Sequence, residues 1–470
     1  MRGTDAGMQR RVHLVVLIPA LTLALAAAGL GQSALAGPGH DSGGTGKHRA
    51  AKGWDEADKS AFGTARSRTS KVWFTMEGGR VSDIYYPDLS TPSIRSLELR
   101  VSDGAGWDRQ STDMASVVSR PDEQSLRYTE VSTDNDGHYR LTEQVVTDPA
   151  RSAVVIQASV ESLDGGQHTL AVSYRPALGN GSAGDQDRSS HKALKTVDTK
   201  ARLASTVLSS PTLQDTGGNT GTIGSSTATI SLGLGHTSRQ STRTATDALA
   251  QPWTTTAAAY DAGWHDYLAT LKPVPASATS IEPQYLASEL VLAAGEDKRH
   301  PGAFVASPST PWVWGDEVPD LSSPSGAYHE LWSRDAYQIG TALYAMGDVG
   351  AAQRIVRWLF RTQQKPDGSF PQNSDVTGKP VWTNLQLDEV TLPIALAHLV
   401  GETDGRTYRG IKKAVAFLMR FRDDETGRRA PFTPQERWEN QSGYSPATIA
   451  AEIDGPVSYT HLTLPTNREV

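Results

Sequence analysis

The sequence predicts a multidomain β + α protein, in which an all-β domain precedes a mainly helical domain. Short runs of alternating apolar and polar residues fill positions 52–252, whereas longer runs with a helical apolar period begin at Ile281. Pro273 and Pro275 lie between these regions and mark a linker. With 470 residues, the chain is long enough for each domain to bury its own core.

The composition favours a neutral substrate. Hydrophobic residues make up 37% and charged residues 21%, and a net charge of −7 gives no reason to expect nucleic acid as a partner. There are 11 Trp beside 8 Phe, and the flat indole face suits sugar rings, although a place in the core is the simpler expectation for any one Trp. The chain has no cysteine, which excludes disulfides and thiolate metal sites.

The N-terminus has the pattern of an export signal. Arg10 and Arg11 precede an apolar run over 12–30, and Ala34-Leu35-Ala36 has the form of a cleavage site. A membrane anchor is the alternative, because the run approaches spanning length. We therefore expect a signal peptide over 1–36, a flexible leader over 37–51, a secreted protein, and no stable membrane insertion after cleavage.

Residues 52–252 carry the strand signals. Alternating segments lie at 71–75, 81–85, 139–146, 153–160, 169–174 and 227–234. Turns rich in Gly, Asp and Asn separate them, which predicts a β-sandwich with polar surface loops such as 179–190. The acidic turn at Asp134–Asp136 is compatible with calcium, but a solvated turn is the simpler interpretation, and we expect no cofactor.

The rest of the chain is expected to be helical. The linker, residues 253–280, carries a helix over 257–271 with Tyr260, Trp264 and Tyr267 on one face. Within 281–454 we expect helices at 285–296, 335–346, after the N-cap Asp348, at 387–400, around 408–418 and at 446–453. Helix pairs with their long loops at one end would form a toroid with a cleft there. The chain holds about half the helices that a closed double ring needs.

Three loop segments carry residues suited to carbohydrate chemistry. The first runs from Tyr328 through Trp332 to Arg334 and Asp335, where a carboxylate, a guanidinium fork and an indole can grip sugar hydroxyls. In the alternative interpretation, Asp335 only caps its helix and pairs with Arg334. In the second, Trp382, Gln386 and Asp388 lie within two turns and are expected to line a cleft wall, with a capped helix as the alternative.

The third segment places Glu439 directly after Trp438. Cleavage of a glycosidic bond needs a carboxylic acid that is still protonated near neutral pH, and an apolar wall raises a carboxyl pKa. We expect Trp438 to supply that wall; a solvated carboxylate paired with Arg437 is the alternative. Zinc-type His spacing, phosphate-binding Gly motifs and a Gly-x-Ser-x-Gly elbow are absent from the sequence.

Taken together, these segments resemble glycoside hydrolase family 15, the glucoamylases, glucodextranases and related bacterial α-glucosidases. The resemblance runs from about Gly53 to Ile453 and is clearest over 71–75, 84–88 and 302–309. It implies an N-terminal β-supersandwich followed by the first half of an (α/α)6 catalytic barrel, with 302–309 as a strand entering the first active-site loop. It also implies an inverting, exo-acting hydrolase that releases β-D-glucose from the non-reducing ends of α-glucans or gluco-oligosaccharides, without a cofactor.

The resemblance also implies roles for single residues. Trp332, Arg334 and Asp335 match the motif that binds the terminal glucose, and Tyr328 matches a neighbouring aromatic residue. Trp382 matches the tryptophan that shields the acid, and Gln386 and Asp388 stand at matching offsets.

In the third loop, Glu439 matches the general acid, with Glu436 as its rival, and Trp438 is its neighbour in the substrate site. Asn440 stands where some family members have a second Glu, so substrate contacts at that position are expected to differ.

The resemblance stops near Asp454. The family's general base lies far downstream, and this sequence shows no counterpart. Gly455 and Pro456 are expected to end the last helix, and the tail 455–470 does not have the pattern of the family. We therefore expect a fragment of the parent enzyme with poor or no activity. The alternatives are an inverting disaccharide phosphorylase, in which phosphate replaces the base, and a non-catalytic glycan-binding surface protein.

Overall fold

The computed structural model describes residue 54 and residues 59–310, 328–439 and 441–463. The expected signal peptide, the leader and Asn440 lie outside these residues. All the described residues belong to one compact unit, residues 50–470.

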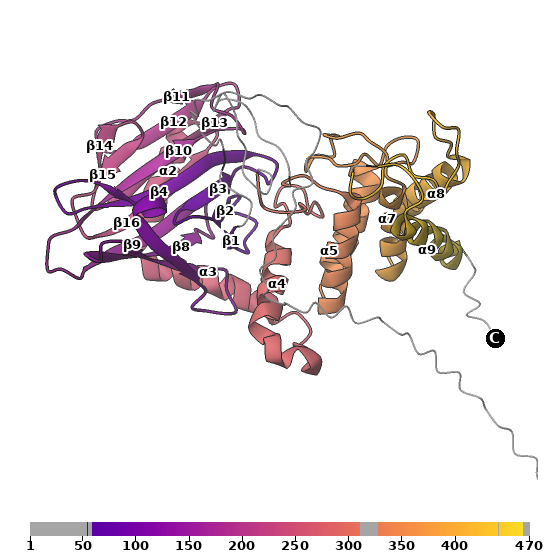
Figure 1. The fold of residues 1–470 in the computed structure, drawn as a ribbon, viewed down its shortest axis with the longest axis horizontal. Coiled ribbons are helices and arrows are strands. Elements are labelled where there is room, and N and C mark those ends of the chain that lie inside the picture. Colours follow the sequence, from indigo (N-terminus) through magenta and orange to yellow (C-terminus); the bar gives the residue numbers. More distant parts are fainter. Residues whose placement is uncertain (1–53, 55–58, 311–327, 440, 464–470) are drawn as a thin grey trace, which may run out of the picture. The chain divides into compact units, whose positions relative to one another are not determined.

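The first part of the described chain forms two antiparallel sheets (Figure 1). The first sheet has the order β1-β2-β3-β4-β10-β15-β14, with β5 paired to β4. Its strands are β1 (Ala61–Gly63), β2 (Trp73–Met76), β3 (Val81–Tyr85), β4 (Pro92–Ser102), β5 (Asp108–Arg109), β10 (Thr169–Pro176), β14 (Gln214–Gly217) and β15 (Thr220–Thr222).

The second sheet has the order β11-β12-β13-β16-β9-β8-β7-β6. Its strands are β6 (Met114–Ser119), β7 (Tyr128–Asp134), β8 (Tyr139–Thr147), β9 (Ala153–Ser162), β11 (Asp185–Asp187), β12 (Leu194–Asp198), β13 (Leu203–Ser210) and β16 (Thr227–Gly235). Alternate residues of β7 are buried, as expected for a strand with one face on a core.

The strand predictions agree with the structure within a few residues, and β3 has the bounds expected from its alternation. Two predictions here are wrong. The polar segment 179–190 is not only a loop, because β11 lies within it and pairs with β12 at the sheet edge. The segment 302–309 forms no strand beyond an isolated bridge between Glu296 and Phe304.

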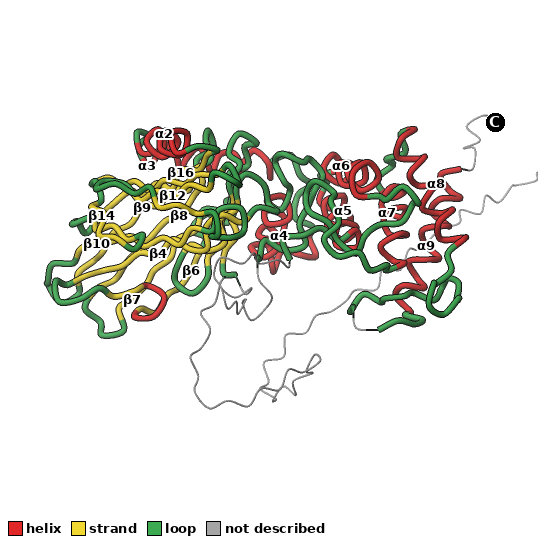
Figure 2. The backbone as a smooth tube through the Cα atoms, turned by 90° about the horizontal axis from the view of Figure 1, so that it is seen from above, coloured by secondary structure: helices red, strands yellow, loops and turns green. Residues whose placement is uncertain are grey.

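Two helices cover the outer face of the second sheet, as Figure 2 shows. Helix α2 (Ser238–Leu249), which the sequence did not predict, packs on β13 and β16, and the short α1 (Gln110–Asp113) precedes β6. Helix α3 (Trp253–Leu268) buries Tyr260, Trp264 and Tyr267 on one face, which confirms the predicted stripe. The Tyr260 hydroxyl donates to the carbonyl of Leu126 at 3.0 Å and so anchors α3 to the β part.

The remaining described residues are helical. After the 3-10 turn η1 (Ala276–Ile281), the helices are α4 (Glu282–Ala294), α5 (Ser333–Met346), α6 (Val349–Trp358) with the π-turn η2 (Leu359–Gln363), α7 (Leu387–Leu399), α8 (Gly405–Arg420) and α9 (Pro446–Thr463). Asp348 caps α6 as predicted, because its side chain accepts from the N–H of Ala351. Helix α7 packs against α5, α8 and α9.

Helix α9 corrects the expected break at Gly455-Pro456. The helix continues through Pro456 to Thr463. Gly455 lies directly against α7, where an added Cβ would stand 2.9 Å from the Cβ of Thr391. Packing against α7 therefore outweighs the local cost of proline, about 3 kcal/mol in a helix interior.

Contacts between the sheets and the helices fix the segment that leads into the candidate site. The Trp73 indole donates to the carbonyl of Ala294 at 3.0 Å, and the Leu89 N–H donates to Asp297 at 2.9 Å. One hydrophobic core runs from the strands into the helices. Among the described residues, no helix is both long and apolar enough to cross a bilayer.

Candidate active site

The first predicted segment lies at the N-terminus of α5. Trp332 occupies the N-cap position with extended backbone and makes no side-chain cap bond. Asp335 lies in the first turn, where the positive end of the helix dipole favours a carboxylate. Burial raises the pKa of Asp335, against the neighbouring Arg334, which lowers it.

Arg334 lies at the centre of a hydrogen-bond network between α5 and α7. Its Nη1 donates to Gln386 at 2.7 Å and to Asp388 at 2.9 Å, and lies 3.1 Å from Glu389. Burial opposes the charge of Arg334, but Glu389 and Asp388 outweigh it and raise its pKa. The guanidinium therefore stays charged and in a fixed place.

Gln386 and Asp388 are fully buried. The expectation that they line a cleft wall is therefore not met, because both side chains are turned to Arg334. Gln386 also donates to Gln435 at 3.1 Å, and Gln435 donates to the carbonyl of Glu439 at 3.0 Å. This chain of contacts links the first segment to the second and the second to the third, through pairs of side chains that are 52 and 49 positions apart.

The two predicted tryptophans meet. The rings of Trp332 and Trp382 are 5.6 Å apart at 74°, an edge-to-face pair. Trp332 is buried and Trp382 is partly exposed, and the backbone N–H of Trp382 donates to the side-chain oxygen of Asn373 at 2.7 Å. Together they offer a partly open aromatic corner beside Arg334.

Glu439 lies within electrostatic reach of the first segment. Burial raises the pKa of Tyr328, and the charge of Glu439 adds to this increase. Glu439 also contributes to the raised pKa of Asp335. The charge of Glu439 thus acts on Tyr328 and Asp335, which each lie more than 100 positions before it in the sequence.

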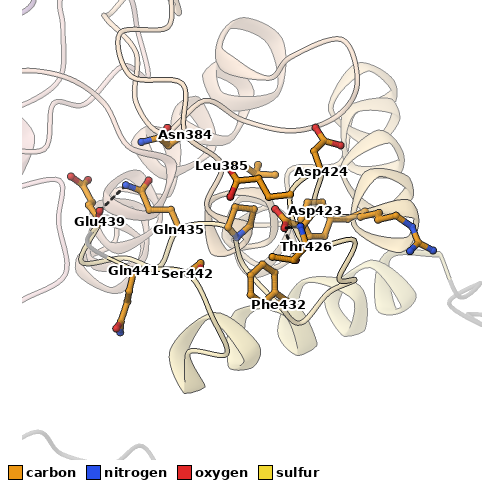
Figure 3. A pocket seen from close by; sticks show the side chains of 14 residues that line it. Asn384, Leu385, Asp423, Asp424, Thr426, Phe432, Gln435, Glu439, Gln441 and Ser442 are labelled. Carbon is orange, nitrogen blue, oxygen red and sulfur yellow. Dashed lines mark hydrogen bonds between the residues drawn. The ribbon is translucent and has the colours of Figure 1, made fainter.

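Glu439 also lines a pocket of about 550 Å³. Glu439 and Gln435 lie at one end of this pocket, and Asp423, Asp424 and Thr426 lie at the other (Figure 3). A pocket of this size accommodates a small oligosaccharide, but Trp332, Arg334 and Trp382 do not line it.

The expectation that Trp438 forms an apolar wall beside Glu439 is wrong. This side chain is 77% exposed, because the loop turns it toward solvent. The rival, Glu436, is buried and accepts from the N–H of Trp438 at 2.8 Å, so its carboxylate stabilises its own loop. The alternative interpretation paired Glu439 with Arg437. Among the described residues these two side chains form no ion pair.

Sequence reasoning missed Glu389, which lies directly under Arg334. Its Oε2 accepts from the N–H of Arg334 at 2.8 Å and from the hydroxyl of Ser333. Burial raises the pKa of Glu389 to about 8, while Arg334 acts to lower it. The sequence carried a signal for this residue, because Asp388 and Glu389 stand together at the start of an apolar helical run. Such a charged pair is unusual in a helix that is buried on all sides.

No metal-binding group of three or more His, Asp or Glu occurs in the part of the chain that the structure describes. At the turn named for calcium, Asp134 accepts from the N–H of His138 at 2.9 Å, which is the geometry of a closed turn.

Comparison with known proteins gives concordant results. The family model for glucodextranase, domain N, matches residues 44–227 and 212–269. A glucoamylase from Clostridium sp. (strain G0005) is 32% identical over 449 residues, covering 86% of this chain and 60% of that protein. The crystal structure of a bacterial glucoamylase complexed with acarbose superposes with a TM-score of 0.78 at 29% identity, covering 92% of this chain and 65% of that chain.

The chain is a glucoamylase-like family member. As a member, it shares a glycoside hydrolase fold of two antiparallel sheets followed by helices. This glucoamylase-like chain spans less than two thirds of the length of either relative, namely 60% and 65%.

Proposed function

We propose that this chain provides the substrate-binding side of an inverting, exo-acting α-glucoside hydrolase that releases β-D-glucose from non-reducing ends. The supporting observation is the fixed charge of Arg334 at the N-terminus of α5, beside the Trp332–Trp382 pair and within electrostatic reach of Glu439. The glucoamylase relatives support a gluco-oligosaccharide as the ligand, since one of them was crystallised with acarbose.

In this proposal, the terminal sugar is held by Arg334, Asp335 and the aromatic corner. A guanidinium donates to sugar hydroxyls and a carboxylate accepts from them, which fixes the ring in one orientation. The partly exposed face of Trp382 supplies the apolar surface on which the ring packs. Tyr328, whose pKa responds to the charge of Glu439, is proposed to add a hydroxyl to this site.

Glu439 is proposed as the general acid. It gives a proton to the oxygen that joins two sugar units, and in an inverting enzyme a second carboxylate activates water on the opposite face. We propose no residue of this chain for that second role. Glu439 has a φ of +68°, a left-handed conformation that is uncommon for a residue other than glycine and that clusters at functional sites.

The finer fold and the location follow from the same proposal. Helices α4–α9 would belong to an (α/α)6 barrel, with residues 52–252 as a supersandwich domain and 253–280 as the linker. Residues 1–36 would act as a signal peptide for export. Sequencing the N-terminus of the secreted protein tests the export proposal, and cleavage anywhere other than after Ala36 would contradict it.

The decisive experiment introduces Glu439→Gln and Glu425→Gln separately into a version of the enzyme that also contains the second carboxylate. Glu425 lines the same pocket and is not among the partners of Arg334. We expect both variants to bind acarbose with the affinity of the unmodified chain in calorimetry. We expect Glu439→Gln alone to lower glucose release, by about 10²–10⁴-fold, because removal of a general acid costs this much.

The outcomes separate the candidate functions. Unchanged glucose release in Glu439→Gln would overturn the acid assignment, and absence of acarbose binding in the unmodified chain would overturn the proposed substrate class. Binding without release would indicate a glycan-binding protein, whereas glucose 1-phosphate formed after addition of phosphate would indicate a phosphorylase.

A further inference from the structure

Two stretches of chain lie side by side directly before the candidate sugar-binding residues. The N–H of Ala306 donates to the carbonyl of Glu330 at 2.9 Å, and the N–H of Ser307 donates to the carbonyl of Tyr328 at 3.0 Å. Trp332 follows only two residues after Glu330. Whatever holds the stretch 306–310 therefore also sets the position of Tyr328 and Trp332.

Strand β3 of the N-terminal sheet holds this stretch through Thr310. The Tyr85 hydroxyl lies 2.9 Å from the Thr310 hydroxyl, and Asp83 accepts from the Thr310 N–H at 3.1 Å. Asp83 also pairs with Lys59 at 3.2 Å. Asp83, Tyr85 and Thr310 are fully buried, so these contacts are shielded from water.

The backbone of β3 is distorted where it makes these contacts. Asp83 has a φ of +38°, and the pairing of β3 with β2 shifts register between Trp73 and Thr75. A bulge of this kind redirects a side chain, and strain of about 1–3 kcal/mol persists only where the surroundings enforce it. In β3, the distortion directs a buried carboxylate to the backbone of Thr310.

The same strand also contacts the second stretch. The rings of Tyr85 and His329 are 6.1 Å apart, and His329 is fully buried next to Tyr328. Burial lowers the pKa of His329 to about 4, against hydrogen bonds to the backbone of Ser309 and Thr310. A neutral imidazole thus ties the two stretches together on the side of Tyr85.

We propose that Asp83 and Tyr85, in the β part of the chain, are positioning residues for the sugar site. They fix Thr310 and His329, and through the paired stretches they set the orientation of Tyr328 and Trp332. The inference rests on the proposed function for its catalytic meaning, but the positioning itself can be measured without it. It gives the N-terminal sheet a role in substrate recognition.

The test compares Tyr85→Phe with Tyr174→Phe. Both tyrosines are buried in the β part and each hydroxyl meets a threonine hydroxyl, Thr310 for Tyr85 and Thr196 for Tyr174. Tyr85→Phe loses its hydrogen bond to Thr310, and Tyr174→Phe loses its bond to Thr196 and a longer one of 3.5 Å to Ser205, so we expect Tm to fall at least as much in Tyr174→Phe. Asp83→Asn serves as a second variant, which removes the charge and keeps the shape.

Two readouts distinguish positioning from stability. Amide hydrogen exchange, followed by mass spectrometry, should become at least about threefold faster over 328–336 in Tyr85→Phe and stay unchanged there in Tyr174→Phe. The Kd for acarbose should rise about five- to tenfold in Tyr85→Phe alone.

Wild-type exchange rates over 328–336 in both Tyr85→Phe and Asp83→Asn would overturn the inference. If the unmodified chain did not bind acarbose, the proposed function would fail, while the exchange comparison would still decide the positioning. Faster exchange with unchanged acarbose affinity would also count against a role in recognition.

Discussion

At the scale of single residues, Arg334 shows how one side chain can serve two purposes. Its contacts with Gln386, Asp388 and Glu389 all involve the same nitrogen, Nη1. The side chain is 15% exposed, so it is not fully enclosed by these contacts. We infer that one nitrogen anchors α5 to α7 while the rest of the fork meets the sugar.

These two roles of Arg334 predict that Arg334→Lys weakens sugar binding and has little effect on the stability of the fold. A lysine ammonium can satisfy the buried acceptors as a point charge, but it lacks the planar fork. We expect a small change in Tm and an acarbose Kd at least about tenfold higher, which corresponds to about 1.4 kcal/mol.

The control for this variant is Arg354→Lys. Arg354 makes a two-pronged ion pair with Glu296, with both distances at 2.7 Å, and contacts none of the proposed sugar-binding residues. It should lower the stability and leave acarbose affinity intact. Normal acarbose affinity in Arg334→Lys would show that Arg334 has only the anchoring purpose.

At the scale of secondary structure elements, β7 and β8 carry two carboxyl groups face to face. Glu130 and Glu143 are direct partners in the strand register, and both are fully buried. Burial raises the pKa of each, and the charge of Glu130 raises that of Glu143 further. The two groups hydrogen-bond to each other, so the pair retains a proton that separate carboxyls would lose.

The pair predicts that stability falls as pH rises. Above the unfolded pKa of about 4.3, the folded state holds a proton that the unfolded chain has lost, which costs about 1.4 kcal/mol per pH unit until the folded pKa is passed. Glu143→Gln replaces the neutral carboxyl with a neutral amide. We expect urea unfolding to show this variant gaining stability over the unmodified chain between pH 5 and pH 8.

A matched control is Glu161→Gln on the neighbouring strand β9, where the side chain is 61% exposed and pairs with Arg140. Its stability difference from the unmodified chain should be nearly constant with pH. A constant difference for Glu143→Gln would mean that the pair does not retain a proton in this range.

At the scale of the whole molecule, Lys298 connects the helical part to the β part. Its amino group donates to the Thr64 hydroxyl at 2.6 Å and to the carbonyls of Ala65 and Ser70 at 2.7 Å. It also lies 5.0 Å from the centre of the Trp73 ring. Together with the shared hydrophobic core, this arrangement implies that the two parts unfold as one unit.

Lys298→Met should therefore weaken the connection between the parts. The substitution keeps an apolar stem but leaves the buried carbonyls without their donor, at a cost of about 1–3 kcal/mol. Calorimetry should show a lower Tm and a transition that broadens or divides in two.

Lys272→Met is the comparison, because Lys272 donates to the carbonyl of Ala345 at 3.1 Å in an exposed place. It should leave both the Tm and the width of the transition close to those of the unmodified chain. A single sharp transition at the original Tm in Lys298→Met would contradict the coupling.

Some elements could be predicted from local pattern because their physics is local. The stripe of α3 and the Asp348 cap of α6 each depend on residues within a turn or two, and both are confirmed. Helix α2 was missed because its Ser- and Thr-rich sequence has low helix propensity. Its position depends on Gly233 of β16, where an added Cβ would come within 2.4 Å of the backbone of Ala245.

The sequence by itself determined that a β-rich region precedes a helix-rich region. It also determined the family resemblance and the three segments that carry Arg334, Trp382 and Glu439. These depend on residue type and spacing, which the chain states directly. The tertiary structure decided that Gln386 and Asp388 are turned to Arg334, that Trp438 faces solvent, and that β3 holds the stretch before Trp332. The contact of Arg334 with Gln386 joins residues more than 50 positions apart, and that of Tyr85 with Thr310 joins residues more than 200 positions apart. Such contacts form because of the free energy of packing between elements that are distant in sequence.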